Sequence, residues 1–118
     1  MTKILIVDDA AFMRMRCSKL LGESGYEVVE ASNGAEAVEK FQAVKPDAVL
    51  LDITMPKMDG IMTLQEIIKI DPNAKVAMVS AMGQRTMVMN ALRSGARDFV
   101  VKPFDGPRVL ETVQKLMK

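Results

Sequence analysis

Five short apolar runs alternate along the chain with longer stretches in which apolar residues recur every three or four positions. The short runs predict β-strands, and the longer stretches have the period of amphipathic helices. The predicted strands are Ile4 to Val7, Val28 to Ala31, Ala48 to Leu51, Val76 to Val79 and Phe99 to Val101. The predicted helices are Phe12 to Ser24, Ala35 to Ala43, Ile61 to Ile70, Gln84 to Ser94 and Pro107 to Met117.

Turn-forming residues separate these segments and agree with the predicted boundaries. Gly25, Gly95 and the Asp71-Pro72-Asn73 stretch stand where helices are expected to end. Asn33-Gly34 and Asp59-Gly60 stand where helices are expected to begin, because Asn and Asp side chains accept hydrogen bonds from free amides of a first turn.

Five strand–helix units in series predict an α/β fold with a doubly wound, five-stranded parallel sheet. The runs Ile4 to Val7 and Ala48 to Leu51 are apolar throughout, which is typical of central strands that are buried on both faces. A chain of 118 residues with 49% hydrophobic content has room for one compact core. We therefore expect residues 1–118 to form a single domain.

Charge and composition exclude several classes of function. Sixteen basic and fifteen acidic residues leave a formal net charge of +1, so no global field attracts nucleic acid. No apolar stretch approaches the roughly 20 residues that span a bilayer, and the N-terminus does not read as a signal peptide. The chain has one cysteine, Cys17, and no histidine, which excludes an intrachain disulfide and a Cys/His zinc site. We expect a cytoplasmic protein without membrane insertion, with Cys17 as an apolar filler.

Polar residues follow four of the predicted strands. Asp8 and Asp9 follow the first, Asp52 the third, Ser80 the fourth and Lys102 the fifth. In an open parallel sheet, ligands bind beyond the carboxyl ends of the strands, so these side chains are expected to converge on one site.

Three crowded carboxylates repel one another unless a cation lies among them, and oxygen ligands with room for water favour Mg²⁺. Asp52 stands alone at its strand end and is the predicted nucleophile, which would form an acyl phosphate. Lys102 and the Ser80 hydroxyl would stabilise the charge on the phosphoryl oxygens. No glycine-rich nucleotide loop is found, so the phosphoryl group is expected to arrive already activated.

Five motifs lie at or near the predicted strand ends: Asp8-Asp9, Leu51-Asp52-Ile53-Thr54-Met55-Pro56, Asp59-Gly60, Ser80-Ala81-Met82-Gly83-Gln84 and Val101-Lys102-Pro103-Phe104. Together they resemble the motifs of two-component response-regulator receiver domains, in particular the single-domain chemotaxis regulators. The resemblance implies a (βα)₅ flavodoxin-like fold with strand order 2-1-3-4-5. It also implies phosphotransfer from a sensor-kinase phosphohistidine, and a protein that catalyses only its own phosphotransfer and dephosphorylation.

The resemblance also assigns roles to individual residues. It implies that Asp9, Asp52 and the Thr54 main-chain carbonyl hold Mg²⁺, that Asp8 contributes through water, and that the Lys102-Pro103 bond is cis. It further implies that phosphorylation draws Ser80 toward the phosphoryl group while the ring of Phe99 turns inward. This change would reshape the face formed by the fourth helix, fifth strand and fifth helix.

The resemblance also implies partners: a histidine sensor kinase, expected to be the chemotaxis kinase, a motor-switch or other effector, and a possible phosphatase. The protein is expected to be mainly a monomer. Thr54 and Met82 occupy the positions that flank the attacking water in the family, and neither is acidic or an amide, so we predict slow self-dephosphorylation. A possible partner face is formed by Arg85, Met89 and Arg93, opposite an apolar stripe of Val88, Ala91 and Leu92.

Alternative interpretations remain open at this point. The chain could be the receiver of a longer transcriptional regulator. A haloacid-dehalogenase-like phosphatase also uses a strand-end Asp with Mg²⁺, but it has a second Asp where Thr54 stands. A flavodoxin has a hydroxyl-rich phosphate loop where this chain has Asp8-Asp9-Ala10-Ala11. Asp8 and Asp9 could also simply cap the first helix.

Overall fold

A computed structural model describes residues 2–53, 59–80, 85–102 and 106–117. Within these ranges five strands alternate with five helices. The strands are β1 (Lys3–Val7), β2 (Glu27–Ala31), β3 (Ala48–Asp52), β4 (Val76–Ser80) and β5 (Asp98–Val101). The helices are α1 (Ala11–Glu23), α2 (Gly34–Val44), α3 (Gly60–Ile70), α4 (Arg85–Arg93) and α5 (Gly106–Leu116).

The strands form one parallel sheet in the order β2-β1-β3-β4-β5, which confirms the predicted (βα)₅ flavodoxin-like topology. All strands and helices were predicted, and their ends differ from the prediction by one residue at most. One shift affects the site: Asp52 and Ser80 are the last residues of β3 and β4, whereas the sequence placed them just beyond the strands. Their main chains are therefore held by sheet hydrogen bonds.

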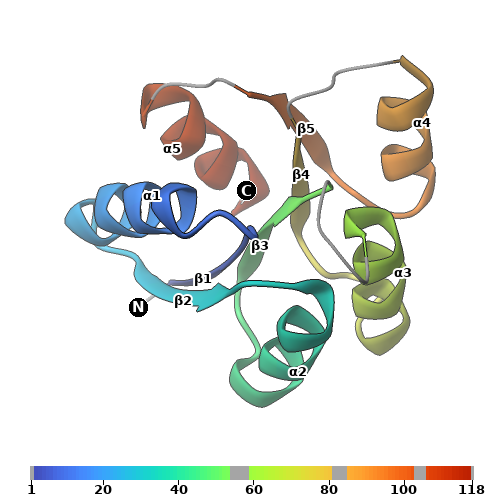
Figure 1. The fold of residues 1–118 in the computed structure, drawn as a ribbon, viewed down its shortest axis with the longest axis horizontal. Coiled ribbons are helices and arrows are strands. Elements are labelled where there is room, and N and C mark those ends of the chain that lie inside the picture. Colours follow the sequence, from blue (N-terminus) through green and yellow to red (C-terminus); the bar gives the residue numbers. More distant parts are fainter. Residues whose placement is uncertain (1, 54–58, 81–84, 103–105, 118) are drawn as a thin grey trace.

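Helices cover both faces of the sheet, with α1 and α5 on one side and α2, α3 and α4 on the other (Figure 1). Each side has its own core. The α1/α5 core includes Cys17, Leu21 and Val113, which pack on the β1 and β3 side chains that face these two helices. The other core includes Phe41 and Leu64. Because β1, β3 and β4 are buried on both faces, the sheet provides a rigid frame for the residues at its carboxyl edge.

The turns between elements follow the residue types that the sequence supplies. Gly25 and Gly95 both have positive φ, 93° and 112°, where a Cβ would be strained. Asn33 caps α2 by accepting a hydrogen bond from Glu36 N, and Asp59 caps α3 by accepting one from Met62 N. The predicted helix ends and starts are thus confirmed at these positions.

The apolar stripe predicted for the fourth helix is partly wrong. Ala91 is fully buried, but Leu92 is 45% exposed and does not belong to the core. Met87 packs against the core instead. Neighbouring residues on a helix point in different directions, so an error of one position in the predicted buried face moves a side chain to the exposed side. With only nine residues, α4 has few positions from which to define that face. Arg85, Met89 and Arg93 are exposed, as predicted.

The environment of Cys17 agrees with the prediction that it fills space. The side chain is buried in α1, and burial followed by the negative charge of Asp8 raises the pKa of its thiol. The thiol is therefore held in its neutral, unreactive form. Among the helices in the described ranges, none has both the length and the hydropathy needed to cross a bilayer.

Candidate functional site

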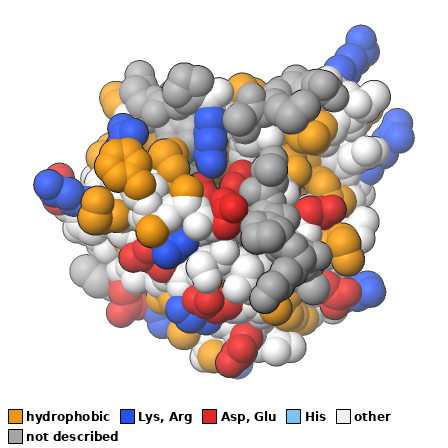
Figure 2. Space-filling model, viewed as in Figure 1, with side chains coloured by type: hydrophobic (Ala, Val, Ile, Leu, Met, Phe, Trp, Pro, Cys, Tyr) orange, Lys and Arg blue, Asp and Glu red, His pale blue; other side chains and the backbone are white. Residues whose placement is uncertain are grey.

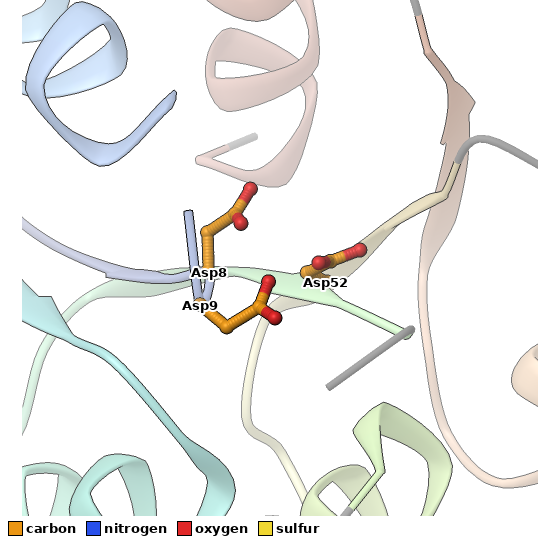
Figure 3. Close-up of side chains that lie close together, drawn as sticks. All are labelled: Asp8, Asp9 and Asp52. Atoms are coloured by element: carbon orange, nitrogen blue, oxygen red, sulfur yellow. The ribbon is translucent and has the colours of Figure 1, made fainter. Parts of the chain in front are cut away.

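The carboxyl edge of the sheet brings three carboxylates together. Asp8 and Asp9 follow β1, Asp52 ends the neighbouring β3, and the three side chains lie next to one another (Figure 3). One carboxylate oxygen from each lies within 4.8 Å of the other two. Asp8 and Asp52 are buried, whereas Asp9 is exposed to solvent. The convergence that the sequence predicted for these three residues is confirmed.

The Lys102 ammonium neutralises part of this negative charge. It lies 3.0 Å from Asp8 Oδ2 and 3.7 Å from Asp52 Oδ1, and its side chain is 19% exposed. Burial alone would lower the pKa of Lys102, but the hydrogen bond to Asp8 and the charges of Asp52, Asp8 and Asp9 outweigh it. The pKa is raised above its usual value, so Lys102 is positively charged at neutral pH.

Ser80 lies at the end of β4, next to β3 and β5. Its main-chain carbonyl accepts a hydrogen bond from Lys102 N at 2.7 Å, which joins the ends of β4 and β5. The side chain is fully buried, and its hydroxyl lies 3.9 Å from the sulfur of Met87 on α4. The structure thus links Ser80 to the helix that follows it, a contact that the sequence did not predict.

The main chain of Asp52 packs directly against the start of α3. Gly60 N donates a hydrogen bond to Ile53 O at 2.8 Å. A Cβ added to Gly60 would lie 2.3 Å from Asp52 O and 2.5 Å from Ile53 Cα, both main-chain atoms. The Asp59-Gly60 pair was predicted to start a helix. The structure adds that only glycine fits against the main chain of the candidate nucleophile.

Asp8 is held by local hydrogen bonds. Its Oδ1 accepts from Ala10 N at 2.9 Å, and its main-chain N donates to Ala31 O at 3.2 Å. The N-cap of α1 is Ala10, which makes no side-chain cap hydrogen bond, so neither aspartate caps the helix. Arg14 donates to the main-chain carbonyl of Asp8. The sequence offered no signal for this contact beyond a basic residue near the start of α1.

The structure leaves part of the predicted site untested. Thr54, Met82 and Pro103 lie outside the described residues, so their predicted roles and the predicted cis bond stay predictions. Phe99 lies on β5, opposite Met78 of β4, and is partly buried against the core on the α2/α3/α4 side. Its position is compatible both with a core residue and with a ring that changes orientation.

The donor set fits a small, hard cation. Three carboxylate oxygens within 4.8 Å of one another can share one ion, and Mg²⁺ prefers oxygen ligands together with water. Without a cation the cluster has an excess of negative charge over Lys102. Acidic side chains gather near the middle of the face that Figure 2 shows, with a basic side chain directly above them.

Comparison with known proteins identifies relatives along nearly the whole chain. The family model described as "Response regulator receiver domain" matches residues 4–114. The chemotaxis protein CheY of Thermotoga maritima is 56% identical, and the match covers 98% of each chain. CheY of Bacillus subtilis is 57% identical over 98% of this chain and 97% of the relative.

Solved structures agree with these matches. The structure of a CheX-CheY-BeF₃-Mg²⁺ complex from Borrelia burgdorferi contains a chain that is 40% identical to this one and has a TM-score of 0.95. The match covers 99% of this chain and 90% of that one. Fold and sequence therefore point to the same family.

Proposed function

The chain belongs to the response regulator receiver family of two-component signalling, and on that premise we propose that it is a phosphorylation-dependent switch with Asp52 as the phosphoryl acceptor. Residues 1–118 would act as one receiver domain that signals rather than turns over a substrate. The observation that carries the proposal is the cluster of Asp8, Asp9 and Asp52 with Lys102 at the carboxyl edge of the sheet.

The acidic cluster would hold Mg²⁺. Asp9, Asp52 and the Thr54 main-chain carbonyl are the proposed direct ligands, with Asp8 acting through water. Mg²⁺ bound there supplies positive charge that offsets the negative phosphoryl oxygens. The fit rests on the three convergent carboxylates.

Asp52 would act as the nucleophile. One oxygen of its carboxylate attacks the phosphorus of a kinase phosphohistidine, the O–P bond forms, and the N–P bond breaks with its electron pair returning to the imidazole. Lys102 is already charged and close to Asp52, so it can neutralise a phosphoryl oxygen without rearrangement. Ser80 would donate its hydroxyl hydrogen to another phosphoryl oxygen.

The signal would pass from Ser80 to the surface. The Ser80 hydroxyl moves toward the phosphoryl group, and the ring of Phe99 on the adjacent strand turns inward. This changes the face formed by α4, β5 and α5, which carries the exposed side chains of Met89, Leu92 and Val101. An effector that binds this face, such as a component of the flagellar motor switch, would read the change.

The relatives favour a role in chemotaxis. Several are chemotaxis proteins that this chain matches over nearly their full length, which favours a stand-alone receiver over the receiver of a longer transcriptional regulator. We propose that the chemotaxis histidine kinase is the phosphoryl donor. We also propose that this protein is cytoplasmic and mainly monomeric. A phosphatase is a further proposed partner, on the basis of the family resemblance. A CheY relative is known in complex with a second protein, CheX, so this fold can bind a protein partner. The family match also favours the receiver over the flavodoxin and phosphatase alternatives.

Intact mass after incubation with acetyl phosphate tests the proposal. We expect one phosphoryl adduct that requires Mg²⁺ and is absent in Asp52→Asn. The matched control is Asp47→Asn at the opposite edge of the sheet, which should be modified like the native protein. No adduct on the native protein would refute the phosphorylation switch. An adduct that persists in Asp52→Asn would show that another residue is the nucleophile.

Slow self-dephosphorylation is a second proposed property. Thr54 and Met82 offer no acidic or amide group to orient the attacking water, so the acyl phosphate should be long-lived. Replacing Met82 with Glu should shorten its lifetime, measured by loss of the mass adduct after removal of acetyl phosphate. An unchanged lifetime would contradict this part of the proposal.

A further inference from the structure

Arg14 connects three elements next to the acidic cluster. It lies near the start of α1, and its side chain is 18% exposed. Nη1 donates to the main-chain carbonyl of Asp8 at 2.6 Å, and Nε lies 3.3 Å from Oε1 of Glu30 on β2. One guanidinium therefore ties α1 to β2 and to the turn that carries Asp8 and Asp9.

The carbonyl that Arg14 contacts belongs to the peptide between Asp8 and Asp9. A peptide unit is planar, so holding the Asp8 oxygen also sets the direction of the Asp9 N–H and the position of the Asp9 Cα. The Asp9 side chain is exposed and has little packing of its own. The placement of its carboxylate therefore depends mainly on this main-chain geometry.

The other groups that hold this turn act on different atoms. Ala31 O receives the Asp8 N–H, Ala10 N contacts Asp8 Oδ1, and Lys102 contacts Asp8 Oδ2. These contacts place the Asp8 main-chain nitrogen and carboxylate. Among the residues that the structure describes, Arg14 supplies the side-chain hydrogen bond to the peptide leading to Asp9. A charged donor at 2.6 Å makes this a strong hydrogen bond.

We propose that Arg14 is a positioning residue that orients the Asp8–Asp9 peptide so that the Asp9 carboxylate meets those of Asp8 and Asp52 around the cation. Glu30 acts through Arg14, because its ion pair directs the guanidinium toward the carbonyl. The inference rests on the proposed function, in that the acidic cluster binds Mg²⁺.

Charge and geometry make opposite predictions for this residue. Arg14 is a cation close to a site for a cation, so its charge alone weakens Mg²⁺ binding. Its removal would then strengthen binding. If Arg14 positions Asp9, its removal must weaken binding. The sign of the change therefore separates the two effects.

Calorimetric titration with MgCl₂ of the unphosphorylated protein measures this sign. We expect Arg14→Met to bind Mg²⁺ about tenfold more weakly than the native protein, as when other groups that orient metal ligands are removed. Arg14→Lys should also bind more weakly, because an ammonium keeps the charge but lacks the fork that spans both the carbonyl and Glu30. Glu30→Gln should show a smaller change in the same direction.

Arg16→Met is the matched control. Arg16 lies on the same helix, and its guanidinium is 5.7 Å from the centre of the Phe12 ring rather than on the acidic turn. This variant removes the same charge and should bind Mg²⁺ as tightly as the native protein, or slightly more tightly. The amide resonance of Asp9 in metal-free protein provides a second readout, which should shift in both Arg14 variants but not in Arg16→Met.

Native-like or tighter Mg²⁺ binding by Arg14→Met and Arg14→Lys would overturn the inference. If the native protein itself does not bind Mg²⁺, the proposed function fails. In that case the amide resonance of Asp9 in the Arg14 variants still tests the positioning role. An unshifted resonance would overturn that role, and a shifted resonance would support it. Circular dichroism shows whether each variant is folded. If Arg14→Met is not, Arg14→Lys and Glu30→Gln carry the test.

Discussion

The two ends of the sheet contain the same kinds of charged residue in different surroundings. At the amino end, Lys3 lies 3.5 Å from Glu27, and the two side chains are 31% and 51% exposed. At the carboxyl end, Lys102 contacts Asp8 and Asp52, whose side chains are 9% and 6% exposed. Water screens the first pair, whereas the second group interacts strongly because little water separates its charges.

The two ends of the sheet differ in the balance of their charges. At the amino end Lys3 and Glu27 form a one-to-one ion pair that is partly exposed, so this pair contributes modestly to stability and leaves no excess charge between its two members. At the carboxyl end three carboxylates surround one ammonium, a surplus of negative charge that suits a cation but opposes folding without one. The buried strands on both faces hold these repelling groups together.

Replacing Gly60 with Ala should have the largest effect at the carboxyl end. The new Cβ would lie 2.3 Å from Asp52 O, so the start of α3 or the end of β3 must move. We expect a loss of about 3 kcal/mol in the free energy of unfolding, measured by urea denaturation.

Gly22→Ala near the end of α1 is the control for Gly60→Ala. No atom lies within 4 Å of the added Cβ, so it should stabilise the protein by about 0.5 kcal/mol. Equal free energies of unfolding for the two variants would show that the close contact between Gly60 and the Asp52 main chain does not affect stability.

Replacing Lys102 with Met should have the next largest effect. The substitution leaves the buried carboxylates of Asp8 and Asp52 without their ammonium, and should lower the free energy of unfolding by about 2 kcal/mol in metal-free buffer. Lys3→Met at the amino end removes an exposed ion pair and should lower it by only about 0.5 kcal/mol. Similar losses for both would mean that burial does not distinguish the two ends.

Asp52→Asn should change stability in the opposite direction. Removing one of three crowded carboxylates should raise the free energy of unfolding by about 1 kcal/mol in metal-free buffer. Saturating MgCl₂ should stabilise the native protein more than this variant, because the ion binds the folded cluster. Asp47→Asn at the amino end should change stability by less than about 0.5 kcal/mol. A destabilised Asp52→Asn would show that repulsion is not significant there.

The smallest expected effect appears at alkaline pH. The pKa of Lys102 in the folded protein is raised above its usual 10.5, so its contribution to stability is complete below pH 10.5. The contribution is lost as the pH rises through the folded pKa. The difference in unfolding free energy between native protein and Lys102→Met should therefore be constant from pH 7 to about pH 10 and decrease above it. A constant difference up to pH 12 would contradict this.

Much of the fold follows from local patterns. The strand and helix positions, the helix caps at Asn33 and Asp59, and the convergence of Asp8, Asp9, Asp52 and Lys102 were all predicted, because apolar periodicity and strand-end polarity are local properties. Leu92 was placed on the wrong side of α4, since a nine-residue helix has too few turns to define its buried face from sequence.

Residue spacing along the chain was sufficient to predict the order of the elements, the parallel sheet and the strand ends that carry the candidate chemistry. Packing between the elements, in contrast, sets which main-chain atoms lie against which side chains. It placed Gly60 on the main chain of Asp52, Arg14 on the carbonyl of Asp8, and Met87 beside Ser80. Such contacts depend on how helices pack across the sheet, and packing is set by side chains far apart in sequence.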